Sequence, residues 1–423
     1  MLTSIVGINW GDEGKGRMVD LLSADYDVVV RYQGGNNAGH TVINEKGKFV
    51  LNLMPSGVLR DTVVNVMGNG MVIDLKHLCG EIERLTEAGV SVSEKNLKIS
   101  DKAVICMPYN VLQDCMEENR LADKKFGSTR RGIGPIYGDK YLKKALRMGE
   151  LFNMDKMKAR LKDILEWKNL TVKAYGEEPV KYEDMVAYLE EFGGKLKKYV
   201  CDVGLYLNSA ANEGKKIMFE AQLGALRDID FGIYPYTSSS STISAYAPIG
   251  AGIPNHKLDE AIGIMKAYST CVGEGPFTAE YFGDKAEALR KAGGEYGAAT
   301  GRPRRVGPFD VVASKYGCRM QAANYVALTK LDVLSYLKEI EVCVGYELNG
   351  KVIDEFPFTD ALDDCKPVFK TLPGWNCDIS SCRKSSDLPK EAYDYIKFIE
   401  KAVGCKIKYV SVGASREEYL VMD

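Results

Sequence analysis

Short apolar runs alternate with amphipathic stretches along the first part of the chain. The runs at 4–9 and 26–32 are rich in Val and Ile and have the length of buried β-strands. The first run is followed by a helical pattern over 14–23, and a further apolar run at 63–67 is followed by a helical pattern over 75–89. Strands that alternate with helices predict an α/β fold with a large, mostly parallel central sheet flanked by helices.

The middle of the chain has a different pattern. Residues 151–214 are rich in Lys and Glu, and their apolar positions recur at steps of three and four residues, which predicts a helical insertion. Because no long linker or internal repeat interrupts the chain, we expect residues 1–423 to form a single elaborated catalytic domain. Further strands are predicted at 215–221, 324–332, 340–348 and 406–413, with a helix at 391–404.

Composition narrows the classes of partner. Lys and Arg (56) nearly balance Asp and Glu (58) among 423 residues, so the overall charge gives no reason to expect a nucleic acid or an anionic membrane as partner. The 11 cysteines form no C-x-x-C pair, and the chain has three histidines, so reduced thiols are expected rather than a metal site. The amino terminus lacks a basic start and a long apolar run, which predicts a cytoplasmic protein.

The segment "GINWGDEGKGRMVD" at 7–20 lies between the first predicted strand and the first helix. Gly11 and Gly16 have the spacing of a phosphate loop, and Lys15 adds a positive charge beside glycines whose N–H groups can approach phosphate oxygens. The usual hydroxyl is absent, and Asp12 and Glu13 bring negative charge into the loop. The alternative is a tight strand-to-helix turn with a solvated lysine. Carboxylates in a phosphate cradle indicate chemistry beyond binding.

A second candidate site is "RYQGGNNAGHTV" at 31–42, in which small and amide residues precede His40. We expect this histidine to lie in a loop shortly after a strand, where functional side chains are common. The alternative is a histidine that only packs. With Asp12, His40 could form a base and acid pair.

A third candidate is "TKLD" at 329–332. One carboxylate, Asp332, can accept hydrogen bonds from both the ring N–H and the exocyclic amine of guanine, whereas adenine offers no such pair of donors. The alternative is that Asp332 caps a helix. Together with a phosphate loop, the motif with its Lys330 predicts a GTP site.

A fourth candidate is the arginine-rich loop at 297–307. Guanidinium groups bind carboxylates through two parallel bonds, so Arg302, Arg304 and Arg305 suit a small acidic substrate, and Thr300 could add a hydroxyl. The alternative is a solvated basic turn. Ser238, in the hydroxyl-rich run at 237–242, is a candidate for phosphate binding.

These motifs together resemble the adenylosuccinate synthetase family over the full length of the chain. The resemblance implies a P-loop-NTPase-like fold and GTP-dependent ligation of IMP and L-aspartate to adenylosuccinate through 6-phosphoryl-IMP, the first committed step from IMP to AMP in purine biosynthesis. It also implies a Mg²⁺-dependent homodimer. The matching segments, in the order and at the spacing of the family, are "WGDEGKG", "YQGGNNAGHT", "GIGPIYGDK", "KAYSTCVGEGPF", "ATGRPRR" and "TKLD".

The resemblance implies roles for individual residues. Asp12 would take the proton from N1 of the hypoxanthine, so that O6 attacks the γ-phosphate. His40 would act as the acid partner at the phosphoryl group, and Lys15 would be catalytic. Asp12 and the carbonyl of Gly39 would hold Mg²⁺, which accounts for a carboxylate in the phosphate loop.

The resemblance implies three sets of binding residues as well. The expected GTP set is Gly11, Glu13, Gly14, Gly16, Gly39, His40, Thr41, Arg304, Lys330, Leu331, Asp332, Ser411, Val412 and Gly413. The expected IMP set is Asp12, Lys15, Asn37, Ala38, Thr129, Lys143, Gln222, Ser238, Val272 and Arg302. The expected aspartate set, which would orient the attacking amine, is Thr300, Arg302 and Arg304.

Several positions depart from the family pattern. Lys143 stands where the family has an arginine that reaches the partner subunit's phosphate site, and it keeps the charge but loses the planar fork. The family's glutamine near the phosphate aligns with Leu223, and the adjacent Gln222 is the candidate for that contact. The smaller departures, in place of Gln, Lys and Thr, are Asn9, Arg17 and Ala299.

Two other functions are open on the sequence. A regulatory GTPase would share the phosphate loop and "TKLD", but it would have no need of an arginine loop for a carboxylate. A non-catalytic nucleotide-binding relative would bind without turnover, and the presence of Asp12, Lys15 and His40 argues against it.

Overall fold

The computed structural model describes residues 1–44, 47–296 and 303–422. A ten-stranded sheet forms the centre of this part of the chain, and every pairing in it is parallel except that of β19 with β20. The expected α/β fold with a large, mostly parallel sheet is confirmed. Across the sheet the order is β20 (Tyr419–Val421), β19 (Ile407–Ser411), β15 (Tyr325–Thr329), β11 (Glu260–Lys266), β1 (Leu2–Gly7), β10 (Ile217–Glu220), β2 (Val28–Arg31), β5 (Val64–Met67), β7 (Leu97–Ser100) and β9 (Val200–Cys201).

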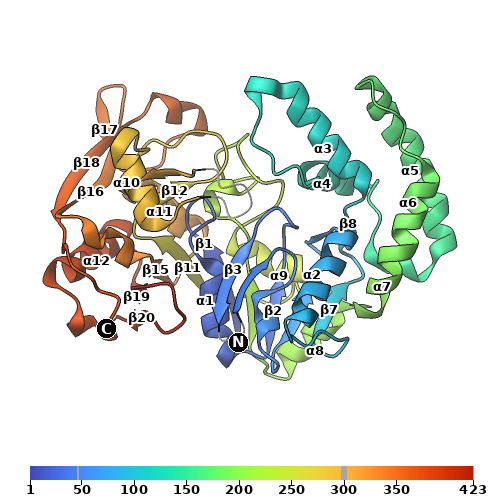
Figure 1. Ribbon diagram of the computed structural model, residues 1–423, viewed down its shortest axis with the longest axis horizontal. Helices are drawn as coiled ribbons and strands as arrows, with labels where there is room; N and C mark the ends of the chain where they lie inside the picture. Colours follow the sequence, from blue (N-terminus) through green and yellow to red (C-terminus); the bar gives the residue numbers. More distant parts are fainter. Residues whose placement is uncertain (45–46, 297–302, 423) are drawn as a thin grey trace.

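Helices lie on both sides of this sheet. In Figure 1, α3 to α7 gather on one side of the molecule, and α10 to α12 lie on the other. The helices are α1 (Lys15–Leu22), α2 (Leu75–Glu87), α3 (Pro108–Leu121), α4 (Ile133–Tyr141), α5 (Met154–Ala174), α6 (Tyr182–Tyr188), α7 (Gly194–Leu196), α8 (Val203–Asn212), α9 (Ala247–Ala251), α10 (Gly283–Gly293), α11 (Val311–Met320) and α12 (Lys390–Val403), with a 3₁₀ helix η9 (Leu331–Tyr336).

Smaller sheets accompany the central one. The largest is built around β16 (Glu339–Leu348), which pairs with β14 (Phe309–Asp310), β17 (Lys351–Ile353) and β18 (Lys366–Pro373). The others are the pairs β3 (His40–Asn44) with β4 (Gly47–Leu51), β6 (Val72–Ile73) with β8 (Val104–Ile105), and β12 (Ser269–Cys271) with β13 (Arg305–Gly307).

One expectation about the elements needs correction. The insertion at 151–214 is not purely helical, because it also supplies β9, which pairs with β7 at the edge of the central sheet. The predicted strand at 340–348 is confirmed as β16, which belongs to the smaller sheet. Periodicity identifies a strand but not its partner. That residues 1–423 act as one catalytic domain stays a prediction.

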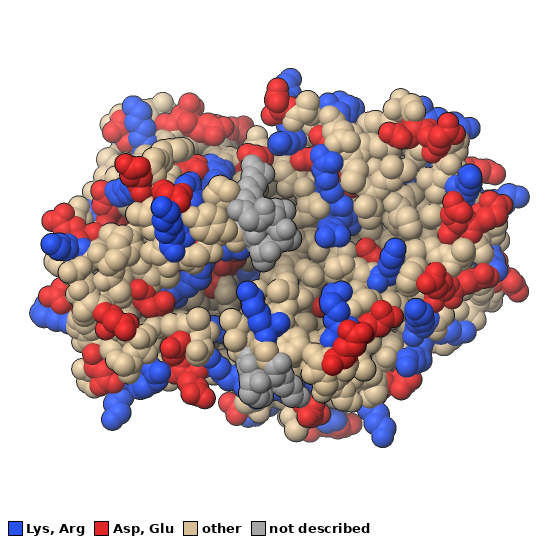
Figure 2. All heavy atoms as spheres, viewed as in Figure 1, with Lys and Arg blue, Asp and Glu red and all other residues tan. Residues whose placement is uncertain are grey.

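The surface and the thiols agree with the composition. Basic and acidic side chains are interspersed over the face drawn in Figure 2. The 11 cysteines are free thiols, as expected. Within the described ranges, no helix is both long enough and apolar enough to cross a membrane.

The end of β1 is fixed by close packing against α11. A Cβ atom on Gly317 of α11 would lie 1.9 Å from the carbonyl oxygen of Ile8, so only glycine allows this approach. Two polar bonds hold the same junction: Asn9 Nδ2 donates to Ser314 Oγ (3.0 Å), and Gln321 Nε2 donates to the carbonyl of Gly7 (3.0 Å). The phosphate loop therefore begins from a rigid point.

We predict that Gly317→Ala lowers the free energy of unfolding by about 1–3 kcal/mol, since helix and strand must separate to admit the methyl group. Gly80→Ala in α2 is the matched control, because the nearest atom to its added Cβ is Arg84 Nη1 at 3.5 Å. That control should gain about 0.5–1 kcal/mol from helix propensity. Urea unfolding measures both, and equal stabilities of the two variants would contradict the packing argument.

Candidate active site

The candidate residues gather where parallel strands end. The phosphate loop follows β1, and the expected guanine motif follows β15. Lys266 and Glu220 are the last residues of β11 and β10, which flank β1. Since parallel strands have their carboxyl ends at one edge, these groups converge there, the usual place for a ligand in such sheets.

The phosphate loop is closed by its own carboxylate. Glu13 Oε1 accepts from the backbone N–H of Gly11 (2.7 Å) and of Asn9 (3.0 Å). Gly11 and Gly14 have φ values of +117° and +93°, and Gly14 immediately precedes α1. Such backbone angles favour glycine, which explains the composition of the loop.

Lys15 is paired within the loop. Its Nζ donates to Glu13 Oε2 (3.0 Å) and to the carbonyl of Gly11 (2.8 Å), and both charged side chains are buried. Lys15 thus places its positive charge in the loop as expected, and this charge is paired with Glu13.

Asp12 points to a different group of cations. Its Oδ2 accepts from Thr270 Oγ1 (2.6 Å) and lies 3.4 Å from Lys266 Nζ and 3.8 Å from Arg304 Nη1. The side chain is 13% exposed. This carboxylate is therefore accessible, ionically compensated and next to an arginine of the expected substrate loop.

His40 is held by a second buried carboxylate. It is the first residue of β3, not a loop residue as expected, and its Nδ1 bonds to Glu220 of β10. Glu220 also accepts from the N–H (2.8 Å) and Oγ (2.6 Å) of Ser56. His40 Nε2 is buried and has no partner among the described residues. One ring nitrogen is thus fixed and the other is available.

The charge states follow from burial. Burial lowers the pKa of His40 and outweighs the opposing effect of Glu220. Burial works against ionisation of Glu220, but its bonds to His40 and Ser56 and the charge of Arg31 dominate and lower its pKa. Glu220 is therefore ionised at neutral pH and orients a largely neutral imidazole, with the Nδ1 proton directed toward it.

The expected guanine motif lies against the phosphate loop. Thr329 Oγ1 donates to the carbonyl of Glu13 (2.7 Å), and Lys330 adopts φ +60° directly after β15. Lys330 occupies the position before η9, so the alternative that Asp332 caps the helix is wrong. Asp332 Oδ1 is buried without a partner among the described residues, as an acceptor awaiting donors would be. Burial raises the pKa of the Asp332 carboxyl, and the charges of Arg17 and Lys330 oppose this effect.

The C-terminal loop completes this region. Arg17 of α1 donates to Ser411 Oγ and to the carbonyl of Gly413, so the segment 411–413 lies next to the start of α1. The substitution of Arg for the usual Lys at position 17 therefore fastens a segment of the expected GTP set.

The arginine loop is only partly described, and Thr300 and Arg302 lie outside the described residues. A backbone bridge pairs Tyr296 with Pro303 on either side of the gap. Arg304 Nη1 donates to Glu295 Oε2 (2.6 Å). Arg305 instead donates to Glu280 through Nε (2.8 Å) and Nη2 (2.5 Å), and so anchors the loop. Arg304, by contrast, lies next to Asp12.

A cavity of about 650 Å³ adjoins these elements. Four residues of the expected IMP set line it: Asn37, Thr129, Ser238 and Val272. Leu223 lines it too and has φ +59°, whereas the preceding Gln222 is fully buried and donates to the carbonyl of Gly35 (2.7 Å). Gln222 thus stabilises the turn at 33–37, and Leu223 forms part of the cavity wall.

Lys143 lies apart from this cavity's lining. It is exposed, follows α4 and adopts φ +62°. Its neighbours Tyr141 and Leu142 are 78% and 58% exposed. An exposed cation thus lies beside two exposed apolar side chains at this point of the surface.

The sequence did not single out the residues that hold these groups. Glu220 and Lys266 end buried strands, where a charged residue in an apolar run signals a functional edge. Glu220 falls in a predicted strand, but β11 was not predicted at all. Glu295 and Thr270 carry no local signal. The expected residues Ala38, Gly39 and Thr41 lie beside His40 in the chain. Within the described residues, no cluster of three or more His, Cys, Asp or Glu side chains could hold a metal ion.

Comparison with known proteins identifies the family. Residues 4–420 match the family model described as adenylosuccinate synthetase. Adenylosuccinate synthetase of Caldanaerobacter subterraneus subsp. tengcongensis is 44% identical over 423 residues, covering 100% of this chain and 99% of its own. The enzyme of Lactococcus lactis subsp. lactis is 42% identical over 422 residues, covering 99% and 98%.

Solved structures agree. The fully ligated adenylosuccinate synthetase of Plasmodium falciparum superposes with a TM-score of 0.93 at 35% identity, covering 100% of this chain and 99% of its own. A cyanophage S-2L succinoaminodeoxyadenylate synthetase shares the fold at 17% identity, with a TM-score of 0.62 and coverage of 99% and 95%. The chain therefore belongs to the adenylosuccinate synthetase family, a family of GTP-dependent ligases.

Proposed function

We propose that this chain ligates IMP and L-aspartate at the edge of the central sheet, in two steps driven by GTP. The observation that carries the proposal is the convergence of Asp12, Arg304 and Lys330 on one hydrogen-bonded group next to the phosphate loop. A base, a carboxylate-binding arginine and a guanine-binding motif are the three parts that this ligation needs.

In the first step Asp12 acts as the general base. It takes the N1 proton of the hypoxanthine, and O6 attacks the γ-phosphate of GTP. The bond between the γ-phosphorus and the β–γ bridging oxygen breaks, so that GDP leaves and 6-phosphoryl-IMP forms. Thr270 and Lys266 hold the carboxylate in one orientation, which favours proton transfer at a fixed position. IMP itself occupies the 650 Å³ cavity, with its phosphate near Asn37, Thr129 and Ser238 and its ribose near Val272.

His40 acts at the phosphoryl group through Nε2. The free site favours the neutral ring, but an incoming polyphosphate brings negative charge next to Nε2 and stabilises the imidazolium, which Glu220 already faces. The protonated ring can then donate to the transferring group. Lys15 turns from Glu13 toward the phosphates, and the N–H groups near Gly14 and Gly16 receive the remaining oxygens.

Mg²⁺ fits the residues present. Asp12 offers an accessible carboxylate, and Gly39 offers a backbone carbonyl in an exposed turn beside His40. Magnesium prefers such sites, with one or two protein oxygens and the rest from phosphate and water. When bound, the ion would neutralise charge on the phosphates.

In the second step the amine of aspartate displaces the phosphate from C6. Arg304 binds a carboxylate of this substrate, because Nη1 is fixed on Glu295 and the guanidinium has other N–H groups to offer. Thr300 and Arg302 belong to the same proposed set and lie outside the described residues. GTP is selected by Asp332, with Lys330, Leu331 and the segment 411–413 around the base.

The partner in the dimer supplies one more cation. We assign Lys143 to the phosphate end of the IMP cavity of a second copy of the chain, since it is exposed beside Tyr141 and Leu142. A regulatory GTPase would need neither this lysine nor Arg304.

The first prediction for this function concerns Asp12 as the general base. Phosphate release from GTP should require both IMP and aspartate, and Asp12→Asn should abolish it while nucleotide binding persists, because an amide cannot accept the N1 proton. Phosphate release and equilibrium GTP binding are measured on the same preparation. Full-strength hydrolysis without IMP would exclude the ligase mechanism, and near wild-type kcat in the variant would exclude Asp12 as base.

The second prediction concerns base selection. Asp332→Asn should weaken GTP and improve use of xanthosine triphosphate, because an amide can donate to the O2 of xanthine where a carboxylate repels it. The ratio of kcat/KM for the two nucleotides is the readout, with Asp378→Asn, far along the chain in an exposed turn, as control. An unchanged ratio would remove Asp332 from the guanine site.

The third prediction tests the shared site. Lys143→Ala and Asp12→Asn should each be poorly active, yet a mixture of the two should regain activity after subunit exchange. One site of each mixed dimer combines the intact Asp12 of one chain with the intact Lys143 of the other. Random mixing makes about half of the dimers mixed, with one good site in two, so about a quarter of wild-type activity should return.

Subunit exchange is followed independently by fluorescence transfer between labelled chains. Exchange without recovery, from two inactive parents, would place Lys143 in its own subunit's site or outside the site. An active Lys143→Ala parent would show that this lysine contributes little.

A further inference from the structure

Glu295 lies at the centre of the group that joins the proposed substrate sites. It is fully buried and lies two residues beyond the end of α10. Four side chains direct donors to its carboxylate: Lys266 Nζ (3.0 Å), Lys330 Nζ (2.7 Å), Arg304 Nη1 (2.6 Å) and Tyr268 OH (2.5 Å). A buried carboxylate that accepts from three cations is unusual, because burying charges is costly unless each one is compensated.

The three cations belong to three different parts of the site. Lys266 also lies 3.4 Å from Asp12, and donates to Thr270 Oγ1 (2.7 Å). Lys330 precedes the helix that carries Asp332, and its Nζ also donates to the carbonyl of Gly293 (2.8 Å). Arg304 lies in the described part of the arginine loop, directly before β13. Each cation is therefore next to the proposed binding site of a different reactant. Lys266 is next to that of IMP, Lys330 to that of GTP and Arg304 to that of aspartate.

The charge balance makes Glu295 necessary. Burial disfavours the Glu295 carboxylate, but the charges of Lys266 and Lys330 outweigh it and lower the pKa of Glu295. Among the residues that the structure describes, Asp12 is the other carboxylate within ion-pair distance of this group, at Lys266 and Arg304. Without the charge of Glu295, these cations would be left to compete for Asp12, the proposed base.

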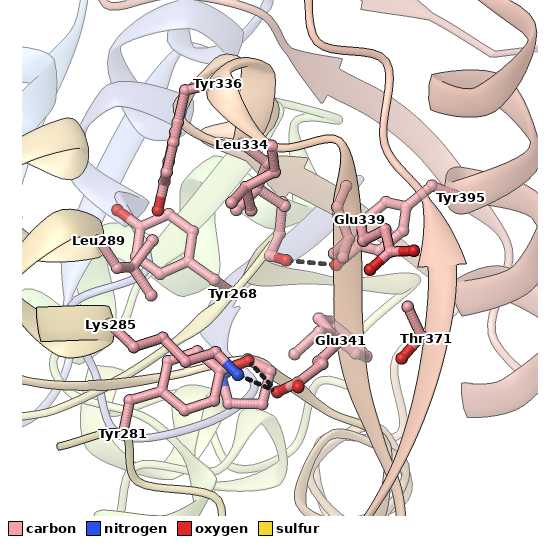
Figure 3. Close-up of a pocket in the computed structure, with 15 residues that line it drawn as sticks. Tyr268, Tyr281, Lys285, Leu289, Leu334, Tyr336, Glu339, Glu341, Thr371 and Tyr395 are labelled. Atoms are coloured by element: carbon pink, nitrogen blue, oxygen red, sulfur yellow. Dashed lines mark hydrogen bonds and ion pairs between the residues drawn. The ribbon is translucent and has the colours of Figure 1, made fainter.

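Packing holds the fourth donor in place. Figure 3 shows the ring of Tyr268 at the wall of a cavity of about 160 Å³, beside Leu289 of α10 and Tyr336 of η9. The Tyr268 ring is buried between these elements, so its hydroxyl has little freedom to leave Glu295. Neither oxygen of the carboxylate can rotate away without breaking bonds to other parts of the site.

We propose that Glu295 is a positioning residue of the ligation, which holds Arg304 for aspartate, Lys330 for GTP and Lys266 against Asp12 in one geometry. The inference rests on the proposed function of Arg304 and Lys330. It predicts that loss of this one carboxylate weakens the binding of both aspartate and GTP, because Arg304 and Lys330 both donate to it.

The test is Glu295→Gln, which keeps the shape of the side chain and removes its charge. We expect the KM values for aspartate and for GTP each to rise by at least about fivefold and kcat to fall, since coupling between sites is typically worth 5- to 150-fold. The KM for IMP should change less than the KM values for aspartate and GTP, because Lys266 contacts Asp12 and Thr270 and is not one of the proposed IMP-binding residues. Glu341→Gln is the matched control, because Glu341 pairs with Lys285 and Tyr281 and has no hydrogen bond or ion pair to the Glu295 group among the described residues.

The outcomes separate a positioning role from a structural one. Parallel increases in both KM values at an unchanged melting temperature support the proposal. An increase in one KM alone, or equal effects of Glu295→Gln and Glu341→Gln, overturns it. If Glu295→Gln does not fold, Glu295→Asp keeps the charge but is one methylene too short to reach all three cations, and unchanged KM values for aspartate and GTP in that variant overturn it equally.

Two further variants distinguish failure of this inference from failure of the proposed function. Arg304→Ala should raise the KM for aspartate, and Lys330→Ala should raise the KM for GTP. If these variants do so and Glu295→Gln does not, the positioning role is wrong and the proposed function stands. If they leave both KM values unchanged, the assignments of Arg304 and Lys330 themselves are wrong.

Discussion

The site depends on the register of β1 between its two parallel neighbours. Ile5 lies opposite Glu220 on one side, and Gly7 lies opposite Ile264 on the other, two residues before Lys266. The next pairing sets Lys266 opposite Thr329, directly before Lys330. A shift of one residue in any of these pairings would turn the terminal side chains to the opposite face of the sheet. The distances around Asp12, His40 and Glu295 are therefore consequences of backbone hydrogen bonds several residues away.

Three buried carboxylates then hold the side chains that lie at the ends of these strands. Glu13 accepts from the phosphate loop and Lys15, Glu220 from His40 and Ser56, and Glu295 from three cations and Tyr268. None of the three has a proposed role in bond making. Each of them holds donors in one orientation, and at the proposed site such fixed donors would reduce the reorganisation that the reaction requires. An anion-binding site is thus built on internal anions.

The sequence predicted the parts of the site that depend on local chemistry. Glycines with positive φ, a lysine near a helix start and the "TKLD" motif have meanings that follow from neighbouring residues, and the structure brings them together. Long-range partners were not predictable in this way. Arg304 and Arg305 are adjacent and chemically identical, yet one contacts Glu295 near Asp12 and the other pairs with Glu280. Arg305 is the first residue of β13 and Arg304 precedes it, so the two side chains have different surroundings.

The same limit explains Gln222 and the fold of 340–348. Gln222 and Leu223 lie just beyond β10, where Leu223 adopts φ +59°; Gln222 donates to the 33–37 turn and Leu223 lines the cavity, and a single-residue offset of this kind cannot be resolved from composition. The run at 340–348 has the same apolar character as a central strand, but its antiparallel partner β18 lies outside the main sheet. Pairing choices of this kind depend on the whole chain.

The bond between Lys15 and Glu13 also bears on how the protein behaves in a mixture of cellular anions. Inorganic phosphate, free carboxylates and unrelated nucleotides are abundant competitors for an open cationic loop. Here the loop lysine is already neutralised by its neighbour, so a visiting anion must displace an internal partner before it gains a full charge interaction. A ligand that also satisfies the vacant acceptor of Asp332 can offset that cost, whereas a bare phosphate cannot. In the proposed GTP site, the pair of Lys15 and Glu13 would thus favour a nucleotide with the right base over other anions.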